Sequence, residues 1–130
     1  GAPGATGQVE WSDMIVSTQG AQAGATLIEW NLATSGTPSG MWDVHTRIGG
    51  FAGSELLLAN CPTTPGSTNI NRNCIAAFMS MHITASASGL YMENNWLWVA
   101  DHDIEQGGTQ TTIYAGRGLL IDSTAGTFWL

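Results

Sequence analysis

The densest cluster of carboxylates in the sequence is the segment 101–105, which reads Asp-His-Asp-Ile-Glu. On an extended strand its three acids would lie on one side, where mutual repulsion could raise one pKa into the range of a general acid. Glycoside hydrolysis uses two carboxylates, but it needs them on opposite sides of a sugar ring. Acids two residues apart lie too close together for that, and Gly107 and Gly108 follow at once. We therefore expect a loop tip with solvated carboxylates, in which Asp101 and Asp103 are weak candidates for catalysis.

Metal and cofactor chemistry receives little support from these residues. A calcium ion at the 101–105 cluster is the less favoured alternative, since Asp and carbonyl oxygens are calcium ligands. No phosphate-binding loop and no His-Glu-x-x-His segment occurs. We expect neither a metal nor a cofactor.

A second group of polar residues alternates with apolar residues over 42–48. Alternation on a strand predicts that Trp42, Val44 and Ile48 point to the core. The opposite face would then carry Asp43, His45 and Arg47. This row could bind sugar hydroxyls or border a neighbouring domain, although a solvated row of compatible charges is the commoner arrangement.

Glutamates and tryptophans inside apolar strands give weaker signals. Glu93 is a further weak catalytic candidate, but Glu29 and Glu93 fit outward positions on alternating strands better. The chain has six tryptophans and three phenylalanines. We expect most of the tryptophans to fill the core and to stack between coils, with one or two lining a glucan cleft, since their faces suit sugar rings.

The elements that must position these residues are short strands. Period-two alternation, broken by clusters of Gly, Ser, Thr and Asn, predicts an all-β chain. The expected strands cover 9–18, 25–33, 41–49, 75–85, 89–100, 111–115, 119–122 and 127–130. No Asn-Gly or Asp-Gly hairpin signal is present, which weakens the case for an antiparallel sandwich.

Faint internal similarity favours a solenoid. The segment 89–94 (Gly-Leu-Tyr-Met-Glu-Asn) resembles 118–123 (Gly-Leu-Leu-Ile-Asp-Ser). A repeat of 20 to 45 residues predicts a parallel β-helix of about four to six coils. Asn94 and Asn95 suit a coil corner, which needs left-handed backbone or an amide ladder. Residues 1–130 would form one partial β-helix domain, a fragment whose open ends are covered by the rest of a parent chain or by another copy.

Composition excludes two classes of partner. Three basic residues face ten acidic ones, giving a formal net charge of −7. A nucleic-acid binder needs basic side chains to displace counterions, and adsorption to an anionic membrane has the same requirement. The longest apolar run, 96–100, is far shorter than the roughly 20 residues of a membrane-spanning helix. We expect no nucleic acid and no membrane partner.

The two cysteines, Cys61 and Cys74, flank a stretch rich in Pro, Thr, Ser and Asn. Metal binding would need more thiols or a nearby histidine pair, so a disulfide that closes the loop 61–74 is the favoured interpretation. Disulfides persist in oxidising compartments, which predicts a secreted, extracellular protein.

Four stretches carry a specific resemblance: 9–13 (Val-Glu-Trp-Ser-Asp), 40–50 (Gly-Met-Trp-Asp-Val-His-Thr-Arg-Ile-Gly-Gly), 89–103 and 114–119. Together, in one collinear order, they resemble fungal glycoside hydrolase family 55, the secreted exo-acting β-1,3-glucanases. The resemblance implies two tandem right-handed parallel β-helices, of which this chain would supply early coils of the second. It also implies hydrolysis of β-1,3-glucan with inversion.

The family's catalytic segments are not found in this chain. The resemblance implies a general-acid glutamate in a Thr-Glu-Thr-like segment and a second important glutamate shortly before it, and no stretch here matches either. We therefore expect scaffold coils and part of a cleft wall, with the isolated chain inactive. The alternative is a non-catalytic β-helix module that binds glucan or supports assembly.

Overall fold

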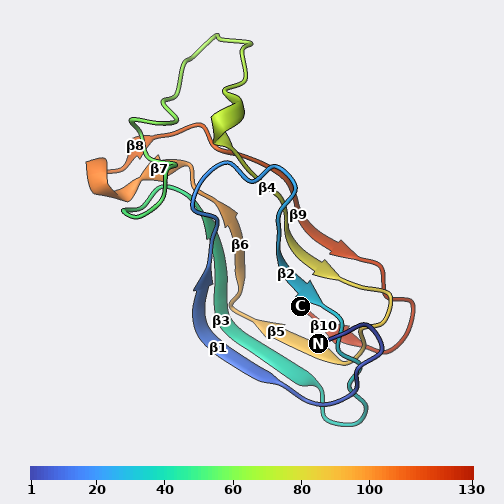
Figure 1. Ribbon diagram of the computed structural model, residues 1–130. Coiled ribbons are helices and arrows are strands. Elements are labelled where there is room, and N and C mark those ends of the chain that lie inside the picture. Colours follow the sequence, from blue (N-terminus) through green and yellow to red (C-terminus); the bar gives the residue numbers. More distant parts are fainter.

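The computed structural model describes residues 1–130, and its regular secondary structure is almost entirely β-strand, which confirms the all-β prediction (Figure 1). The first sheet contains β1 (Glu10–Val16), β3 (Ser39–Ile48), β5 (Leu90–Glu93), β6 (Trp96–Val99) and β10 (Phe128–Trp129). The second sheet contains β2 (Thr26–Trp30), β4 (Ile75–Ile83) and β9 (Tyr114–Ile121). A small antiparallel ribbon pairs β7 (His102–Asp103) with β8 (Thr109–Gln110), and the 3-10 turns are η1 (Arg72–Cys74) and η2 (Ile104–Gln106). No helix has the length and apolar character to span a membrane.

The chain alternates between the two sheets as it advances, and every strand pair within them is parallel. We call one visit of the chain to both sheets a passage. The strands of each passage therefore lie beside those of the preceding one. Glu10 pairs with Gly40, and Trp42 pairs with Glu93 after the longer second passage. Parallel strands need long crossover connections, and here each crossover carries the chain to the opposite sheet, so that the two sheets bury their inner faces against each other.

The core lies between the sheets in two clusters. The larger cluster is built around Met41, Met81, Ile83 and Leu90, all fully buried. The smaller cluster contains Ile48, Leu56, Cys61, Cys74, Ala76 and Ala77. Burying one large aliphatic side chain contributes about 1.5–3 kcal/mol, so these inward positions supply much of the stabilisation of the sheets.

A column of left-handed residues bends the first sheet. Asp13, Asp43 and Asn94 have φ of 56°, 53° and 54°, and strand register places them side by side in successive passages. Asp and Asn are the non-glycine residues that tolerate this conformation best. Asn94 donates its side-chain amide to Asp43 Oδ1, which links two members of the column.

Asn95 fixes the same bend through its amide. Its Nδ2 donates to the carbonyl oxygens of Met41 and Glu93, and its Oδ1 accepts from Val44 N at 3.0 Å. The prediction that Asn94 and Asn95 form a corner is confirmed.

The bend also corrects one expectation. Trp42 was expected in the core with Val44 and Ile48, but Met41 is fully buried there and Trp42 is only half-buried on the outside. The left-handed residue at Asp43 interrupts the period-two alternation, so positions 42 and 44 no longer share a face.

Two strand boundaries differ from the sequence expectation. The predicted strand 89–100 is divided at the bend into β5 and β6, and the predicted strands 111–115 and 119–122 are largely one strand, β9. β9 pairs with β4 along its length, including Arg117 with Met79 and Leu119 with Met81. The partner strand satisfies the backbone through the Gly-Arg-Gly segment that suggested a break.

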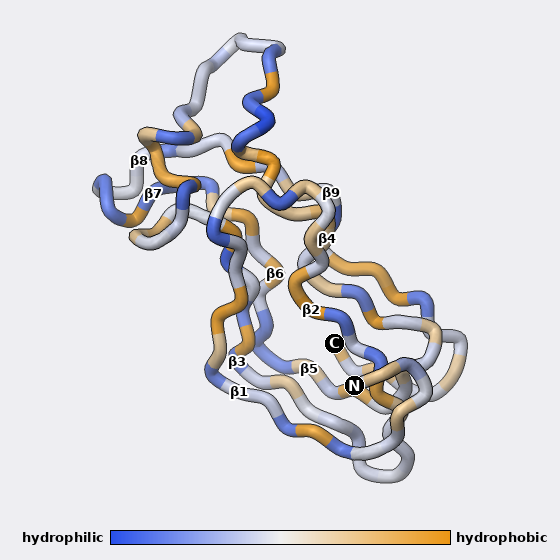
Figure 2. Tube along the Cα trace, in the orientation of Figure 1, coloured by the Kyte–Doolittle hydropathy of each residue, from blue (hydrophilic) through white to orange (hydrophobic).

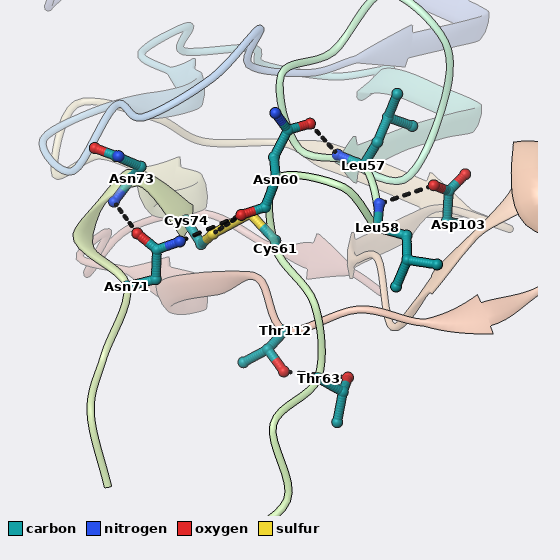
Figure 3. The surroundings of a disulfide bond; sticks show 10 residues. All are labelled: Leu57, Leu58, Asn60, Cys61, Thr63, Asn71, Asn73, Cys74, Asp103 and Thr112. Carbon is teal, nitrogen blue, oxygen red and sulfur yellow. Dashed lines mark hydrogen bonds between the residues drawn. A yellow bond between two sulfur atoms is a disulfide. The ribbon is translucent and has the colours of Figure 1, made fainter. Parts of the chain in front are cut away.

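The predicted disulfide between Cys61 and Cys74 is present, and both cysteines are buried. It closes a loop that projects from the body of the molecule (Figure 1). In the loop-entropy model such a cross-link contributes about 3 kcal/mol. Figure 3 shows the base of the loop, where Asn71 Nδ2 donates to Asn60 O at 3.2 Å.

Candidate functional site

The outer face of the first sheet gathers aromatic side chains that lie far apart in the sequence. Register places His45 of β3 beside Trp96 of β6, and their rings stack at 5.3 Å with an interplanar angle of 10°. Trp96 then contacts Trp98 at 5.5 Å between ring centroids, and Trp98 contacts His102 at 5.8 Å. We call these four residues, His45, Trp96, Trp98 and His102, the aromatic row. Trp96 is 52% exposed, so the row presents a ring face to solvent.

Arg47 holds one member of the row in place. Its guanidinium carbon lies 4.3 Å from the centroid of the Trp98 ring, a cation–π contact. Its Nη2 lies 3.5 Å from the carbonyl oxygens of Gly50 and His102. The structure thus brings two of the three predicted row residues, His45 and Arg47, onto the aromatic row, while Asp43 lies at the bend.

Asp101 lies next to this row and pairs with His102. His102 Nδ1 is 2.6 Å from Asp101 Oδ1. The hydrogen bond to His102, aided by backbone hydrogen bonding and the charge of Arg47, lowers the pKa of Asp101 below its usual value. A carboxyl group that gives up its proton this readily is poorly suited to be a general acid.

Asp103 corrects the prediction of a solvated acidic loop. Its carboxylate is buried, with Oδ2 accepting from Leu58 N and Oδ1 accepting from Glu105 N, both at 2.8 Å. Asp103 caps the 3-10 turn η2. Glu105 lies within this turn, and its Oε1 accepts from Ala52 N at 2.9 Å. The three acids of segment 101–105 therefore do not share one side, because the chain leaves the extended conformation after Asp103.

Glu93 and Glu29 both lie on outer faces, as predicted. Tyr91 donates its hydroxyl to Glu93 Oε2 at 3.0 Å, and Asn31 Nδ2 donates to Glu29 Oε1 at 2.6 Å. Both glutamates are exposed. The hydrogen bond and the negative charge of Glu93 raise the pKa of Tyr91 above its ordinary value of 10.0.

The Tyr91–Glu93 pair predicts a specific alkaline titration. Tyr91 is one of two tyrosines, so ultraviolet absorbance can follow its ionisation. We expect Tyr91 to titrate above 10.0 and the Glu93→Gln variant to bring it back toward that value. Because the folded pKa is raised, the pair's stabilisation is complete below the unfolded pKa and is lost as pH rises through the folded pKa. Tyr114→Phe is the control that isolates the signal, and an unchanged Tyr91 curve in Glu93→Gln would contradict the pairing.

Trp42 and Tyr91 extend the aromatic surface on the other side of the bend. Their ring centroids are 6.2 Å apart. The Trp42 indole lies directly over Gly40, where any Cβ would overlap the ring. Gly40 therefore makes room for the indole on the outside of the sheet.

Of the two structural uses expected for the tryptophans, core filling holds for Trp30, and stacking between neighbouring strands holds for Trp42 and Trp96. Trp30 is buried, whereas Trp96 and Trp129 are 52% and 45% exposed and the others are half-buried. Methionines such as Met41, Met79 and Met81 fill the core instead. The spacing Trp96-x-Trp98 on one strand was the sequence signal for a shared outer face, but the sequence did not show that His102 would join it.

The aromatic row is an open surface and not an enclosed cleft. The largest hollow, about 530 Å³, is lined by hydroxyl-bearing loop residues such as Thr6, Thr34 and Ser88, and none of the candidate residues borders it. No group of three or more His, Cys, Asp or Glu side chains is placed to hold a metal ion. This geometry suits contact with an extended ligand more than chemistry within this chain.

Known proteins similar to this chain cover it from end to end. It is 47% identical over 130 residues to a glucan 1,3-beta-glucosidase of Cochliobolus carbonum, covering 99% of the chain and 16% of that protein. It is 49% identical over 133 residues to a probable glucan endo-1,3-beta-glucosidase of Arthroderma benhamiae, covering the whole chain and 15% of that protein. A non-secreted LysM effector, LysM15, of Penicillium expansum is 41% identical across the whole chain, which covers 9% of it. No protein-family model matches.

The chain thus spans about one sixth of the glucosidases that it matches. The two identities confirm the resemblance to β-1,3-glucanases that the four sequence stretches indicated. Along its whole length, this chain is a homologue of one segment of the glucan 1,3-beta-glucosidases.

Proposed function

We propose that the chain is a segment of a secreted, inverting exo-β-1,3-glucanase, in which it supplies scaffold and part of the surface that contacts the glucan. The observation that carries this proposal is 47–49% identity over the whole chain to proteins named glucan glucosidases. The general-acid glutamate would lie in another part of the parent protein. The disulfide supports the secreted setting, since such bonds persist in oxidising compartments.

The fold of the segment is, in this proposal, a right-handed parallel β-helix that belongs to the second of two tandem helices. In this proposal the strand order corresponds to three complete turns and the beginning of a fourth at β10, fewer than the expected four to six, because the disulfide loop lengthens the second turn. Right-handedness is supported by the strong general preference of parallel crossover connections.

The remaining part of the parent chain is the proposed partner at the open ends of the stack. β1 and β2 form one free edge, and β9 and β10 form the other. Leu119 and Ile121 pair with buried residues of β4 yet are each 38% exposed, as is expected of inward side chains that await a covering layer. Another copy of the chain is the alternative cover.

The aromatic row is the proposed contact with β-1,3-glucan. Sugar rings present apolar C–H faces that pack on indole rings, while the polar edges of His and Trp serve hydroxyl groups. Trp96 offers the most exposed indole, and Arg47 orders Trp98 beside it. Asp43 lies at the bend, two residues before His45, and its carboxylate accepts from the Asn94 amide.

The carboxylates of this chain are proposed to have other tasks than proton donation. Asp101 has a lowered pKa, Asp103 has both oxygens engaged by backbone N–H groups, and Glu93 accepts the hydroxyl of Tyr91. An inverting enzyme needs an acid and a base about 6.5–9.5 Å apart on either side of the sugar. We therefore expect no release of reducing sugar from laminarin by the isolated chain.

Binding of laminarin oligosaccharides tests the proposed contact. We expect Trp96→Ala to weaken binding at least about tenfold, because it removes the most exposed stacking surface, equivalent to roughly 1.4 kcal/mol. Isothermal titration calorimetry measures the change. Phe78→Ala is the matched control, since Phe78 is a comparably exposed aromatic residue (47%) on the second sheet. Equal affinities of wild type and Trp96→Ala would contradict glucan contact at the aromatic row.

The open row also favours a second candidate, a non-catalytic module that binds glucan or supports assembly. The full-length protein that contains this segment separates the two functions. Release of reducing sugar from laminarin supports the glucanase, whereas binding without turnover supports the module.

A further inference from the structure

The loop between the two cysteines is the most exposed part of the molecule. Residues 62–73 are all exposed, and the loop projects away from both sheets (Figure 1). Its sequence is Pro-Thr-Thr-Pro-Gly-Ser-Thr-Asn-Ile-Asn-Arg-Asn, and it is mostly hydrophilic or neutral in hydropathy (Figure 2). Neither the core nor the aromatic row uses these residues.

The base of this loop is held firmly. Beyond the disulfide, Thr112 N donates to Cys61 O at 2.9 Å, and Pro62 forms a bridge with Thr111. Figure 3 shows Asn60 and Asn71 joined beside the disulfide. The loop is therefore presented at a fixed place on the surface.

The tip of the loop, in contrast, makes few hydrogen bonds that an enzyme binding it would have to break. Its backbone makes a turn from Ser67 N to Thr64 O, and Asn69 N donates to Ser67 Oγ. Thr63 Oγ1 accepts from Thr112, but no hydrogen bond engages the hydroxyls of Thr64 and Thr68. By comparison, hydroxyl residues such as Ser39 and Thr46 are fully buried. A modifying enzyme could bind the tip without breaking a sheet ladder.

We propose that Thr64, Ser67 and Thr68 are acceptors of O-linked sugar. Exposed Ser and Thr interspersed with Pro are typical of O-glycosylated segments, and Pro65 keeps the preceding residue extended. The proposal rests on the secreted setting that the disulfide supports and does not depend on glucan hydrolysis.

The reaction is a glycosyl transfer from a sugar activated as a phosphate ester. The hydroxyl oxygen of Thr or Ser bonds to the anomeric carbon, and the bond from that carbon to the phosphate oxygen breaks. The phosphate leaves with the electron pair, and the hydroxyl proton passes to a base of the transferase. No oxidation or reduction takes place.

Peptide mass spectrometry of the protein secreted from yeast tests the proposal. The chain has no lysine, and cleavage at Arg47 and Arg72 releases peptide 48–72, which carries the whole acceptor set. After reduction we expect this peptide to carry whole hexose masses. The triple variant Thr64→Ala/Ser67→Ala/Thr68→Ala should lose them, while the control Ser35→Ala/Thr37→Ala, which alters another exposed Thr-Pro loop, should keep them.

A thiol assay on the same material shows whether the disulfide has formed. An unmodified peptide 48–72 from the secreted, disulfide-bonded chain would overturn the proposal. So would hexose confined to other peptides, or hexose on peptide 48–72 that persists in the triple variant. Laminarin binding by the same samples reports on the proposed glucan contact separately, so failure of one proposal is distinguishable from failure of the other.

Discussion

Replacing Gly89 by alanine is expected to destabilise the chain by about 3 kcal/mol. Gly89 has φ of 69°, a conformation that costs a residue with a Cβ about 1 kcal/mol or more. A Cβ at this position would also overlap the carbonyl oxygen of Thr34, and overpacking of this kind costs about 1–3 kcal/mol. The backbone cannot move away freely, because Ser39 N donates to Gly89 O at 2.8 Å. Because Gly89 has no Cβ, the turn that leads into β5 can lie directly beside the turn at Thr34 in the preceding passage.

Gly36→Ala is the matched control for this variant. Gly36 has a similar φ of 78°, but a Cβ there would meet nothing within 4 Å. We expect it to cost about 1 kcal/mol, which is the conformational part alone. Urea unfolding, with the midpoint and slope fitted separately, measures both variants. Equal losses in the two would show that close stacking of the turns at Thr34 and Gly89 does not matter.

The sequence predicts this fold well where the alternation is regular. Val44 and Ile48 are buried as expected, and the disulfide follows from the spacing and the composition of its loop. Prediction fails where one residue leaves the β conformation. Asp43 and Asn94 both adopt left-handed backbone; residue type indicated the corner at Asn94, but the period-two pattern around Asp43 gave no sign of one there. Such a residue changes which face the side chains before and after it share, so Trp42 lies outside although Val44 and Ile48 are buried.

The candidate site, like the fold, could be predicted from the sequence only in part. His45 and Arg47 were predicted on an outer face from their own strand, and they lie there. Their aromatic neighbours Trp96 and Trp98 come from 51 residues further along the chain, and the length of the intervening disulfide loop sets that register. A single sequence does not fix the register between passages of unequal length. The aromatic row therefore became visible only when β3 and β6 were placed side by side.

Asp103→Ala is expected to destabilise the chain by about 3 kcal/mol. The Asp103 carboxylate accepts from Leu58 N and Glu105 N, and hydrogen bonds to a charged group are worth about 1.5–3 kcal/mol each. The substitution leaves both donors without this partner and removes the cap of η2. Asp101→Ala is the control, since Asp101 is exposed and its carboxylate is hydrogen-bonded to the neighbouring His102. We expect that variant to leave the urea midpoint nearly unchanged, because exposed carboxylates contribute little to stability.

The comparison separates a structural carboxylate from a catalytic one. A catalytic acid is held ready for substrate, so its removal costs activity and leaves unfolding nearly unchanged. Asp103→Ala is expected to show the reverse, a large shift of the urea midpoint. In the glucanase proposed above, the full-length variant should lose hydrolysis only in proportion to its unfolded fraction. A folded Asp103→Ala protein of unchanged stability that had lost laminarin hydrolysis would assign proton transfer to Asp103 and contradict its role as a cap. The physical basis of the expected result is that both oxygens of the Asp103 carboxylate are engaged by the N–H groups of Leu58 and Glu105, so that its removal leaves two backbone donors without their partner.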